Sequence, residues 1–404
     1  MHTYAHRIRT VAAAAALVAA TLVVLGGRAD AATGPTFVGG QSVSASDGSD
    51  SSSLSYNGSV TLVVWTQPVG SGSDIYGRIM APDTTSIGNP FPISTATNRN
   101  EADPDVAWDG TSWLVVWDTT SSTSLSRPDI HGRRVSSSGG LLGSELTISS
   151  TPADQVGPSV AAGANGQFLV VWEDFRNLKT DVDIYGQRVT KAGALLDGSG
   201  RRLSNDSTSS SSDDSRPDVA WNGSTYLTVF RSQDTGESIS GRAIRPDGTV
   251  AFSGDIVSSP DSDLELSWPV IASNGSDFLI AFNLRYPGTD HGTDVWSARI
   301  TDFDADATVA PIVQADGEQL YPAITFNGNY LVAWEEGDDI WAGRLRPNGT
   351  VLDGAVITGP KTADASVALA PGGSKANQFA YSWSATPPNG LSGVGALGVQ
   401  FAPK

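Results

Sequence analysis

Short apolar runs of four or five residues recur along almost the whole chain, separated by polar turns. A typical pair of runs, residues 104–108 and 113–117, flanks the turn sequence Asp109-Gly110. Runs of this length that are rich in Val and Trp and bounded by Asn-Gly or Asp-Gly are typical of antiparallel strands joined by tight hairpins. The pattern therefore predicts an all-β protein.

The pattern is a repeat. The aromatic residue that closes the second run of each copy recurs at spacings of 49 to 58 residues. Most copies also hold a third run of the Asp-Ile-Tyr-Gly type and a Gly-containing turn before a fourth run. Four strands in about 50 residues match one propeller blade, whereas a sandwich domain needs about 100 residues. Seven copies are present, with anchors at Trp65, Trp117, Trp172, Phe230, Phe282, Trp334 and Trp383.

The two ends of the array complement each other. The last copy ends too close to Lys404 to hold a fourth strand, whereas residues 36–44 precede the first copy and resemble a fourth strand. Pairing this strand with the last blade would remove the free edges that an open array leaves. We therefore expect residues 32–404 to form one seven-bladed β-propeller of four-stranded blades, with residues 36–44 closing the last blade.

One copy carries the repeat signature most completely. It has Leu-Val-Val-Trp at residues 169–172 and Asp-Ile-Tyr-Gly-Gln-Arg-Val at residues 183–189. In these motifs the chain resembles a family of secreted bacterial β-propeller repeat proteins, and the resemblance extends over nearly all of residues 32–404. It implies the fold. Because the family as a whole has no assigned activity, the resemblance implies no catalytic residue.

The N-terminus has the three parts of a secretory signal peptide. Arg7 and Arg9 precede an apolar run over residues 11–25, and a small-residue cleavage pattern ends at Ala31. The apolar run is short of a full membrane span. We therefore expect residues 1–31 to be removed, leaving a secreted, extracellular monomer without membrane insertion.

Charge and cysteine content narrow the range of functions. The chain has 43 Asp and Glu against 25 Lys and Arg, a formal net charge of −18, and no Cys. An acidic surface repels phosphate backbones, which argues against nucleic acid as a partner. The absence of Cys excludes disulfides, thiol catalysis and cysteinyl zinc sites.

Residues that recur in every copy are expected to build the scaffold, so function is expected where the copies differ. One position, the residue before the repeated Pro, has no common chemistry among the copies. Alignment places this residue of each copy around the mouth of the central channel: Ser51, Asp103, Gly157, Arg216, Trp268, Tyr321 and Asp364.

The fourth to sixth copies bring aromatic rings and hydrogen-bonding groups to one sector. This combination suits a sugar, whose ring faces are apolar and whose rim carries hydroxyls. We therefore expect a lectin-like module that binds extracellular glycan, or another small ligand, on the variable-loop face. In the alternative interpretation the aromatics cap blade interfaces and the arginines solvate an acidic surface. The candidate ligand-binding residues are Arg216, Arg231, Trp268, Asn283, Arg285, Tyr286, His291, Tyr321 and Glu335.

An enzyme, either a propeller-type polysaccharide lyase or a glycoside hydrolase, is the second possibility. The sequence contains no nucleophile elbow, phosphate loop or His-rich metal motif. A lyase could use Tyr286 or His291 as base and acid, with Arg216 or Arg285 neutralising a uronate carboxylate so that the adjacent proton can leave. A protein–protein interaction platform is the third possibility.

One turn contains three alternating carboxylates, Asp302, Asp304 and Asp306, at a spacing by which short loops bind calcium. Ala307 stands where such loops have Gly, and no Glu closes a twelve-residue loop, so this is not a helix-loop-helix site. Calcium is the only cofactor that the sequence suggests, and a solvated acidic turn is the simpler interpretation.

Overall fold

The computed structural model describes most of the chain beyond the N-terminal segment. Among the described residues, no helix is long and apolar enough to cross a membrane. The described ranges are 36–42, 50–82, 86–95, 99–121, 127–177, 182–204, 213–233, 236–259, 264–285, 292–337, 339–356, 363–371, 378–386 and 393–400.

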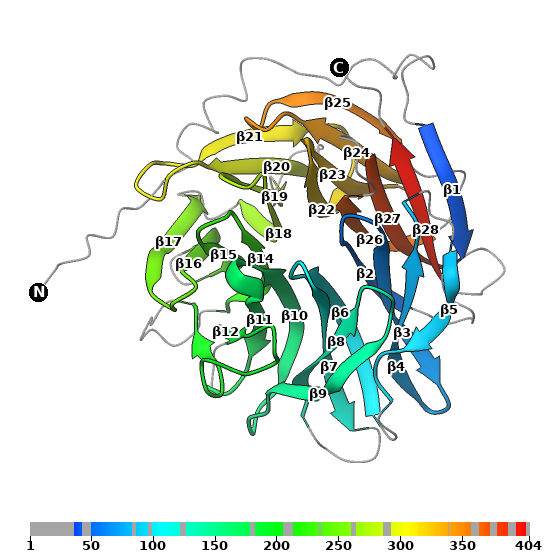
Figure 1. Cartoon of the computed structure of the whole chain (residues 1–404). Coiled ribbons are helices and arrows are strands. Elements are labelled where there is room, and N and C mark those ends of the chain that lie inside the picture. The colour runs from blue at the N-terminus through cyan, green and yellow to red at the C-terminus, as the bar shows by residue number, and fades with distance from the viewer. Residues whose placement is uncertain are drawn as a thin grey trace, which may run out of the picture.

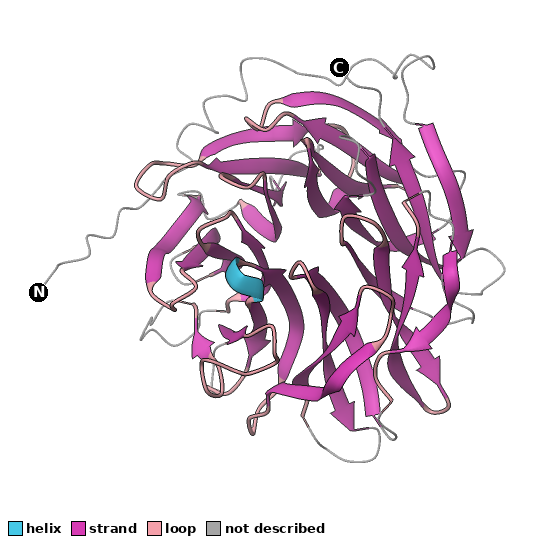
Figure 2. Ribbon diagram, in the orientation of Figure 1, coloured by secondary structure: helices cyan, strands magenta, loops and turns pink. Residues whose placement is uncertain are grey.

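The all-β fold is confirmed: the described residues form 28 strands and one 3-10 helix, η1 (Ala164–Gly166) (Figure 2). The first fourteen strands are β1 (Thr36–Ser42), β2 (Asp50–Tyr56), β3 (Thr61–Val69), β4 (Gly72–Met80), β5 (Ser86–Pro92), β6 (Arg99–Trp108), β7 (Ser112–Ser121), β8 (Asp129–Ser136), β9 (Leu141–Ser149), β10 (Gln155–Ala162), β11 (Phe168–Asp174), β12 (Asp183–Val189), β13 (Arg201–Arg202) and β14 (Ser215–Trp221). The others are β15 (Tyr226–Ser232), β16 (Ser238–Ile244), β17 (Val250–Ser258), β18 (Glu265–Ser273), β19 (Phe278–Arg285), β20 (Thr293–Ile300), β21 (Thr308–Val313), β22 (Gln319–Asn327), β23 (Asn329–Glu336), β24 (Asp339–Leu345), β25 (Val351–Val356), β26 (Ala363–Pro371), β27 (Gln378–Thr386) and β28 (Gly393–Gln400).

The strands pair in sequence order within antiparallel sets of four. Strands β10–β13, β14–β17, β18–β21 and β22–β25 each form a separate four-stranded sheet. Strands β2–β5 and β6–β9 form two such sets that are joined into one larger sheet by a single parallel pairing, between Ser73 of β4 and Asn100 of β6. In the remaining sheet β1 pairs antiparallel with β28, beside β27 and β26, so segments from both ends of the chain share one sheet.

The sheets stand around a common centre, in a propeller-like arrangement (Figure 1). The first strand of each set lies innermost, and each of these strands contacts the first strand of the neighbouring set. The contacts run from β2 through β6, β10, β14, β18 and β22 to β26, which in turn contacts β2. The first strands thus form a closed circuit around the centre.

The recurrent aromatic anchors lie between neighbouring sheets and fill the core. Trp172 of β11, for example, shares an apolar cluster with Leu114 and Val116 of β7 in the preceding sheet. The core position expected for these residues is confirmed for every anchor whose side chain is described, each at most 1% exposed: Trp65, Trp117, Trp172, Phe230, Phe282 and Trp334.

Tight turns close the first hairpins as the Asn-Gly and Asp-Gly pairs predict. Gly110 and Gly223 have φ values of +95° and +97°, which a residue without a side chain adopts at little cost. The Asp109 carboxylate accepts hydrogen bonds from the backbone N–H groups of Thr111 and Ser112, at 2.6 and 2.7 Å. These turns lie at the end of the sheets opposite the loops that join one set of strands to the next.

Candidate functional site

A bulge interrupts the first strand of successive sheets, close to the start of that strand. At the bulge the pairing register shifts, and one residue adopts the left-handed backbone conformation, with φ between +37° and +59°. For residues with a side chain this conformation is uncommon and costs roughly 1–3 kcal/mol unless the surroundings hold it. We call the six positions that share it the mouth ring: Ser51, Asp103, Gly157, Arg216, Trp268 and Tyr321.

The mouth ring coincides with the set that sequence alignment placed around the channel. Alignment on the repeated Pro thus identified one backbone position across six sets of strands. The seventh member of the aligned set, Asp364, lies in β26, and its side chain is outside the described part of the chain.

Polar side chains from the preceding sheet fasten several bulges. The backbone N–H of Gly157 donates to Asp118 Oδ2 at 3.1 Å, and that of Arg216 donates to Glu173 Oε1 at 2.8 Å. In the same way the backbone N–H of Tyr321 donates to Asn283 Oδ1 at 3.3 Å. Each acceptor directly follows an aromatic anchor. Because successive residues of a strand point to opposite faces, the anchor packs against the preceding set of strands and the fastening group reaches the next set.

Three members of the mouth ring form a stack that joins β14, β18 and β22. The Arg216 guanidinium lies over the Trp268 ring, with Cζ 3.1 Å from the ring centroid. The Tyr321 ring meets Trp268 edge-on, at a centroid distance of 4.6 Å and an interplanar angle of 85°. Arg216 and Tyr321 are exposed and Trp268 is half-buried. The structure thus brings together three candidate residues that lie 105 positions apart along the chain from first to last.

Other candidate residues of this sector have partners of their own. Asn283 is fully buried, and its amide Nδ2 also donates to the backbone oxygen of Gln319 at 2.7 Å. Arg231 pairs with Glu237 through two hydrogen bonds of 2.9 and 2.6 Å. These contacts give Asn283 and Arg231 a role in holding strands and sheets together.

The remaining candidates are more scattered. Arg285 is exposed at the end of β19 and pairs with Glu265 at 3.5 Å. Glu335 is half-buried in β23, opposite Leu320 of β22, next to the mouth ring residue Tyr321. Tyr286 and His291 lie outside the described residues.

Carboxylates occupy the part of the mouth formed by the second and third sets of strands. Asp103 is exposed and accepts a hydrogen bond from the Ser51 hydroxyl at 3.0 Å. Burial, with the nearby charge of Asp103, raises the pKa of Asp118 to about 7. Burial also raises the pKa of Glu173, and desolvation lowers the pKa of Arg216. The mouth therefore loses negative charge as the pH falls toward mildly acidic values.

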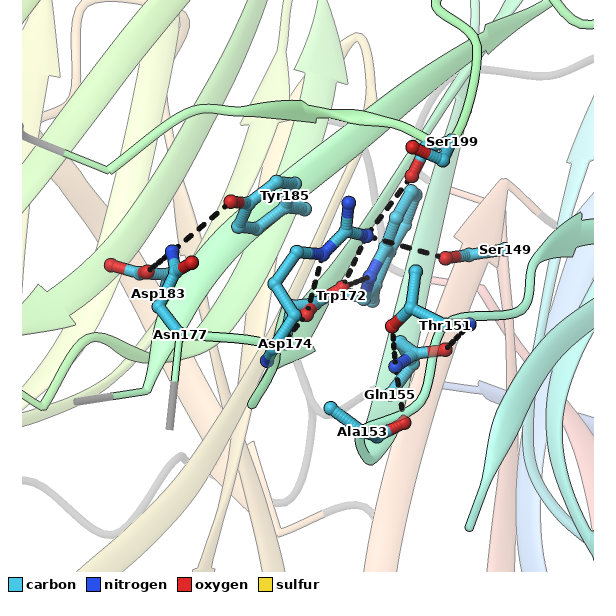
Figure 3. Close-up of polar contacts among 11 residues, drawn as sticks. Ser149, Thr151, Ala153, Gln155, Trp172, Asp174, Asn177, Asp183, Tyr185 and Ser199 are labelled. Carbon is cyan, nitrogen blue, oxygen red and sulfur yellow. Dashed lines mark hydrogen bonds and ion pairs between the residues drawn. The ribbon is translucent and has the colours of Figure 1, made fainter. Parts of the chain in front are cut away.

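A second group of polar side chains, within the β10–β13 sheet, is fully paired (Figure 3). The Trp172 indole N–H donates to Asp174 at 2.8 Å, and Arg176 donates to both oxygens of Asp174 at 2.8 and 2.6 Å. The Arg176 guanidinium also lies 3.9 Å from the centre of the Tyr185 ring. The equivalent indole bond recurs from Trp65 to Gln67 and from Trp334 to Glu336, which indicates a structural role.

The recurrent Asp and Arg of the third strand have structural partners. Asp183 accepts hydrogen bonds from Asn177 and Ser204, and Arg202 pairs with it. Arg188 pairs with Asp197, and an ion pair of the same kind joins Arg344 to Asp353. These pairs give the recurrent Asp and Arg of the third strand a structural role.

The equivalent polar side chains of the β6–β9 set of strands have only some of their hydrogen bonds formed. His131 stands where Tyr185 stands in β12, and its Nδ1 lies 2.6 Å from Glu145, which Arg99 also contacts at 3.0 Å. Within the described chain, the buried atoms Trp117 Nε1, Thr119 Oγ1 and Glu101 Oε1 have no hydrogen-bond partner. Burial raises the pKa of Glu101 to about 7. The sequence signal for this difference was the replacement of Tyr by His131.

The acidic turn between β20 and β21 remains a predicted calcium site. Asp302, Asp304 and Asp306 are exposed, and the Asp302 carboxylate accepts the backbone N–H of Asp304 at 2.9 Å. Over the described ranges, no three His, Asp or Glu side chains gather closely enough to hold a metal ion.

No protein-family model and no curated protein match this sequence. Solved structures do resemble it. A protein of unknown function from Dyadobacter fermentans has a TM-score of 0.55 at 13% identity, over 77% of this chain and 97% of that chain. A prolyl endopeptidase has a TM-score of 0.54 at 10% identity. The match covers 88% of this chain but only 49% of the endopeptidase chain. The polysaccharide lyase Uly1 has a TM-score of 0.52 at 6% identity, over 89% and 91% of the two chains.

At these identities the likeness shows the fold alone. The endopeptidase and the lyase differ in the activities that their names give, and the third protein has no known function, so the shared architecture does not select an activity. Function must be argued from the side chains of the mouth.

Proposed function

We propose that the protein is a secreted binding module that recognises extracellular carbohydrate at its mouth ring. The observation that carries the proposal is the Arg216–Trp268–Tyr321 stack, which is built entirely from residues in the left-handed backbone conformation. The ligand would lie across the start of strands β14, β18 and β22.

Backbone strain supports a functional role for these side chains. Glycine tolerates the left-handed conformation best, and Gly157 occupies one of the six positions. The other five carry side chains, which include the bulky rings of Trp268 and Tyr321. Strained residues of this kind concentrate at binding and catalytic sites, where the surrounding structure holds them in place. The ring therefore retains these side chains at a cost in folding stability.

The chemistry of the stack suits a saccharide. One face of Trp268 is covered by Arg216, so the exposed Tyr321 ring and the outer face of the guanidinium are the flat surfaces left for an apolar sugar face. The Arg216 N–H groups, and Glu173 beside them, can then bind the hydroxyls of the rim. The polysaccharide lyase with a similar fold shows that this architecture can accommodate a polysaccharide ligand.

A glycoside hydrolase is the second candidate, and one observation favours it. Asp118, whose pKa burial and the charge of Asp103 raise to about 7, lies near the exposed Asp103, so the mouth holds two neighbouring carboxyl groups of which Asp118 can carry a proton near neutrality. Glycoside hydrolysis uses such a pair as acid and as base or nucleophile. The lyase alternative depends on Tyr286 and His291, which lie outside the described residues.

A glycan array with the mature protein tests the proposal directly. Binding is expected, and repeating the array with EDTA tests the calcium prediction. Each bound glycan is then assayed for unsaturated uronate by ultraviolet absorbance and for new reducing ends. Binding without product supports the binding module, and product would instead identify an enzyme. Absence of binding on the whole array would contradict the carbohydrate proposal and favour a protein partner.

The ring closure proposed here is that of a seven-bladed propeller completed by residues 36–44. The pairing of β1 with β28 and the closed circuit of first strands support it. Deleting residues 36–44 should expose the edge of β28 and sharply lower the melting temperature. A deletion variant that melts like the parent would contradict closure. Secretion is tested separately, because N-terminal sequencing of the exported protein should begin at Ala32.

A further inference from the structure

The arginines of the proposed binding sector differ in how they are paired. Arg231 is held by Glu237 through two short bonds, and Arg285 lies 3.5 Å from Glu265. Arg216 makes no ion pair with any described residue.

The carboxylate nearest to Arg216 is used elsewhere. Glu173 accepts the backbone N–H of Arg216 at 2.8 Å, which fastens the bulge. Its charge acts on the Arg216 guanidinium, but no carboxylate among the described residues is hydrogen-bonded to that group. The guanidinium lies flat on Trp268, and stacking of this kind occupies its face but not the N–H groups at its edge. Arg216 is exposed, so these donors are available to a ligand.

A fixed, planar guanidinium with free edge donors is the usual protein partner of a carboxylate, which it can bind through two parallel hydrogen bonds. We propose that Arg216 selects saccharides that carry a carboxylate, so that the ligand is a uronic-acid-containing glycan. The inference rests on the proposed carbohydrate-binding function. In the bound state the uronate carboxylate pairs with Arg216 while the sugar ring lies against Tyr321.

The neighbouring acidic groups give this recognition a pH dependence. The charged and titratable groups around Arg216 are Glu173, the already paired Arg231 and the phenol of Tyr321. Asp103 and Asp213 lie near Glu173, and Asp118 lies near Asp103. Burial raises the pKa of Glu173, and the pKa of Asp118 is about 7, so both lose negative charge as the pH falls. A sugar carboxylate, with a pKa near that of an α-carboxyl group, about 3.5, remains ionised at pH 5.5. Binding of the acidic glycan should therefore strengthen from pH 8 to pH 5.5.

The test compares an oligogalacturonate with its methyl ester, which keeps the sugar rings but lacks the charge. Calorimetric titrations are made with the mature parent and with Arg216→Gln. The variant should bind the acid about 10- to 100-fold more weakly, the range expected for a lost charged hydrogen-bonded pair, and the ester within about threefold of the parent. The affinity of Arg216→Lys for the acid should lie between those of the parent and Arg216→Gln, since Lys keeps the charge but lacks the planar guanidinium.

A matched control removes the same charge elsewhere. Arg245→Gln lies in the exposed turn between β16 and β17, away from the mouth ring, and should bind both ligands like the parent. Circular dichroism and melting curves establish that each variant folds. Equal weakening of acid and ester by Arg216→Gln, or no weakening of either, would overturn the inference.

The same titrations separate this inference from the proposed function. A parent that binds the ester or a neutral oligosaccharide, but not the acid, overturns the selection of carboxylates and leaves carbohydrate binding in place. A parent that binds no saccharide overturns both. Affinity for the acid that is unchanged or weaker at pH 5.5 contradicts the role of Glu173 and Asp118.

Discussion

Two tryptophans of this protein occupy contrasting surroundings. Trp172 belongs to the recurrent interior: it is fully buried, and its indole N–H is bonded to Asp174 (Figure 3). Trp268 belongs to the mouth ring, where it is half-buried, has a left-handed backbone and contacts Arg216 and Tyr321. The interior residue is buried with its indole N–H bonded, whereas the mouth residue keeps a partly exposed ring on a strained backbone. Repetition along the chain thus separates residues that fill the core from the variable residues at which we propose binding.

The largest expected effect is in the interior. Trp172→Ala should lower the free energy of unfolding by about 3–5 kcal/mol, because it leaves a cavity between two sheets and removes one of the hydrogen-bond donors to Asp174. Chemical denaturation of parent and variant measures the change. A variant that unfolds within about 1 kcal/mol of the parent would show that the anchors are dispensable and would remove the contrast.

The next largest effect is on the pH dependence of stability, and it compares equivalent buried positions in the β6–β9 and β10–β13 sets of strands. The raised pKa of Glu101, about 7 against an ordinary 4.5, means that the folded protein binds a proton more tightly than the unfolded chain. Stability from this group is therefore present below about pH 4.5 and is lost as the pH rises to about 7. Glu101→Gln removes the dependence and should be more stable than the parent at pH 8, by up to about 3 kcal/mol.

Denaturation curves at pH 5 and pH 8 check this prediction. Gln155→Glu provides the matched change, because Gln155 pairs with Asp174 in the same register in which Glu101 pairs with Thr119. It should introduce in the β10–β13 sheet the loss of stability at high pH that Glu101→Gln removes from the β6–β9 sheet. Identical pH profiles for the parent and Glu101→Gln would contradict the assignment.

A smaller effect is expected for the mouth tryptophan, and in a different measurement. Trp268→Ala should weaken binding of a glycan identified on the array by about 1–3 kcal/mol, as loss of a central contact residue does. Its unfolding free energy should change much less than that of Trp172→Ala, since Trp268 is only half-buried. Tyr321→Ala should behave similarly. If both variants unfold as readily as Trp172→Ala, the stack is structural, and the carbohydrate proposal loses its main support.

The smallest effect tests the strain itself. Ser51→Gly should raise the unfolding free energy by about 0.5–1 kcal/mol, because glycine relieves the left-handed backbone and the lost contact to Asp103 is exposed. Gly157→Ser, the reverse change at an equivalent position, should destabilise by a similar amount. Thermal denaturation of the two variants measures the expected gain and the expected loss of stability. If both variants are stabilised, or both destabilised, backbone strain is not the cause.

Much of the fold was predictable because it is repeated. The Trp172 anchor and the Asp109-Gly110 turn follow from local patterns that recur in copy after copy, and recurrence removes the ambiguity of a single motif. The membership of the mouth ring was also predictable, because the repeated Pro marks the bulge. The left-handed backbone at Trp268 was not, since an aromatic residue is among the least expected there.

The contacts across sheets could not be predicted. Asn283 was predicted to bind ligand. In the structure its amide bonds the backbone of Gln319 and of Tyr321 in the neighbouring sheet, which depends on how the two sheets are placed side by side. The stacking of Arg216 on Trp268 depends on the same placement. The sequence pattern predicts which positions face the centre, but it does not predict which of their side chains hydrogen-bond or stack with one another.

The fastened bulge has a consequence for the evolution and design of this architecture. Because the backbone N–H groups of Gly157, Arg216 and Tyr321 are bound by neighbouring sheets, the conformation of each position is held whatever side chain it carries. Substitutions there can alter what the mouth recognises while the sheets, hairpins and anchors remain unchanged. The side chains of the mouth ring can therefore be exchanged in many combinations, and libraries that vary its six positions together should yield folded proteins of new specificity.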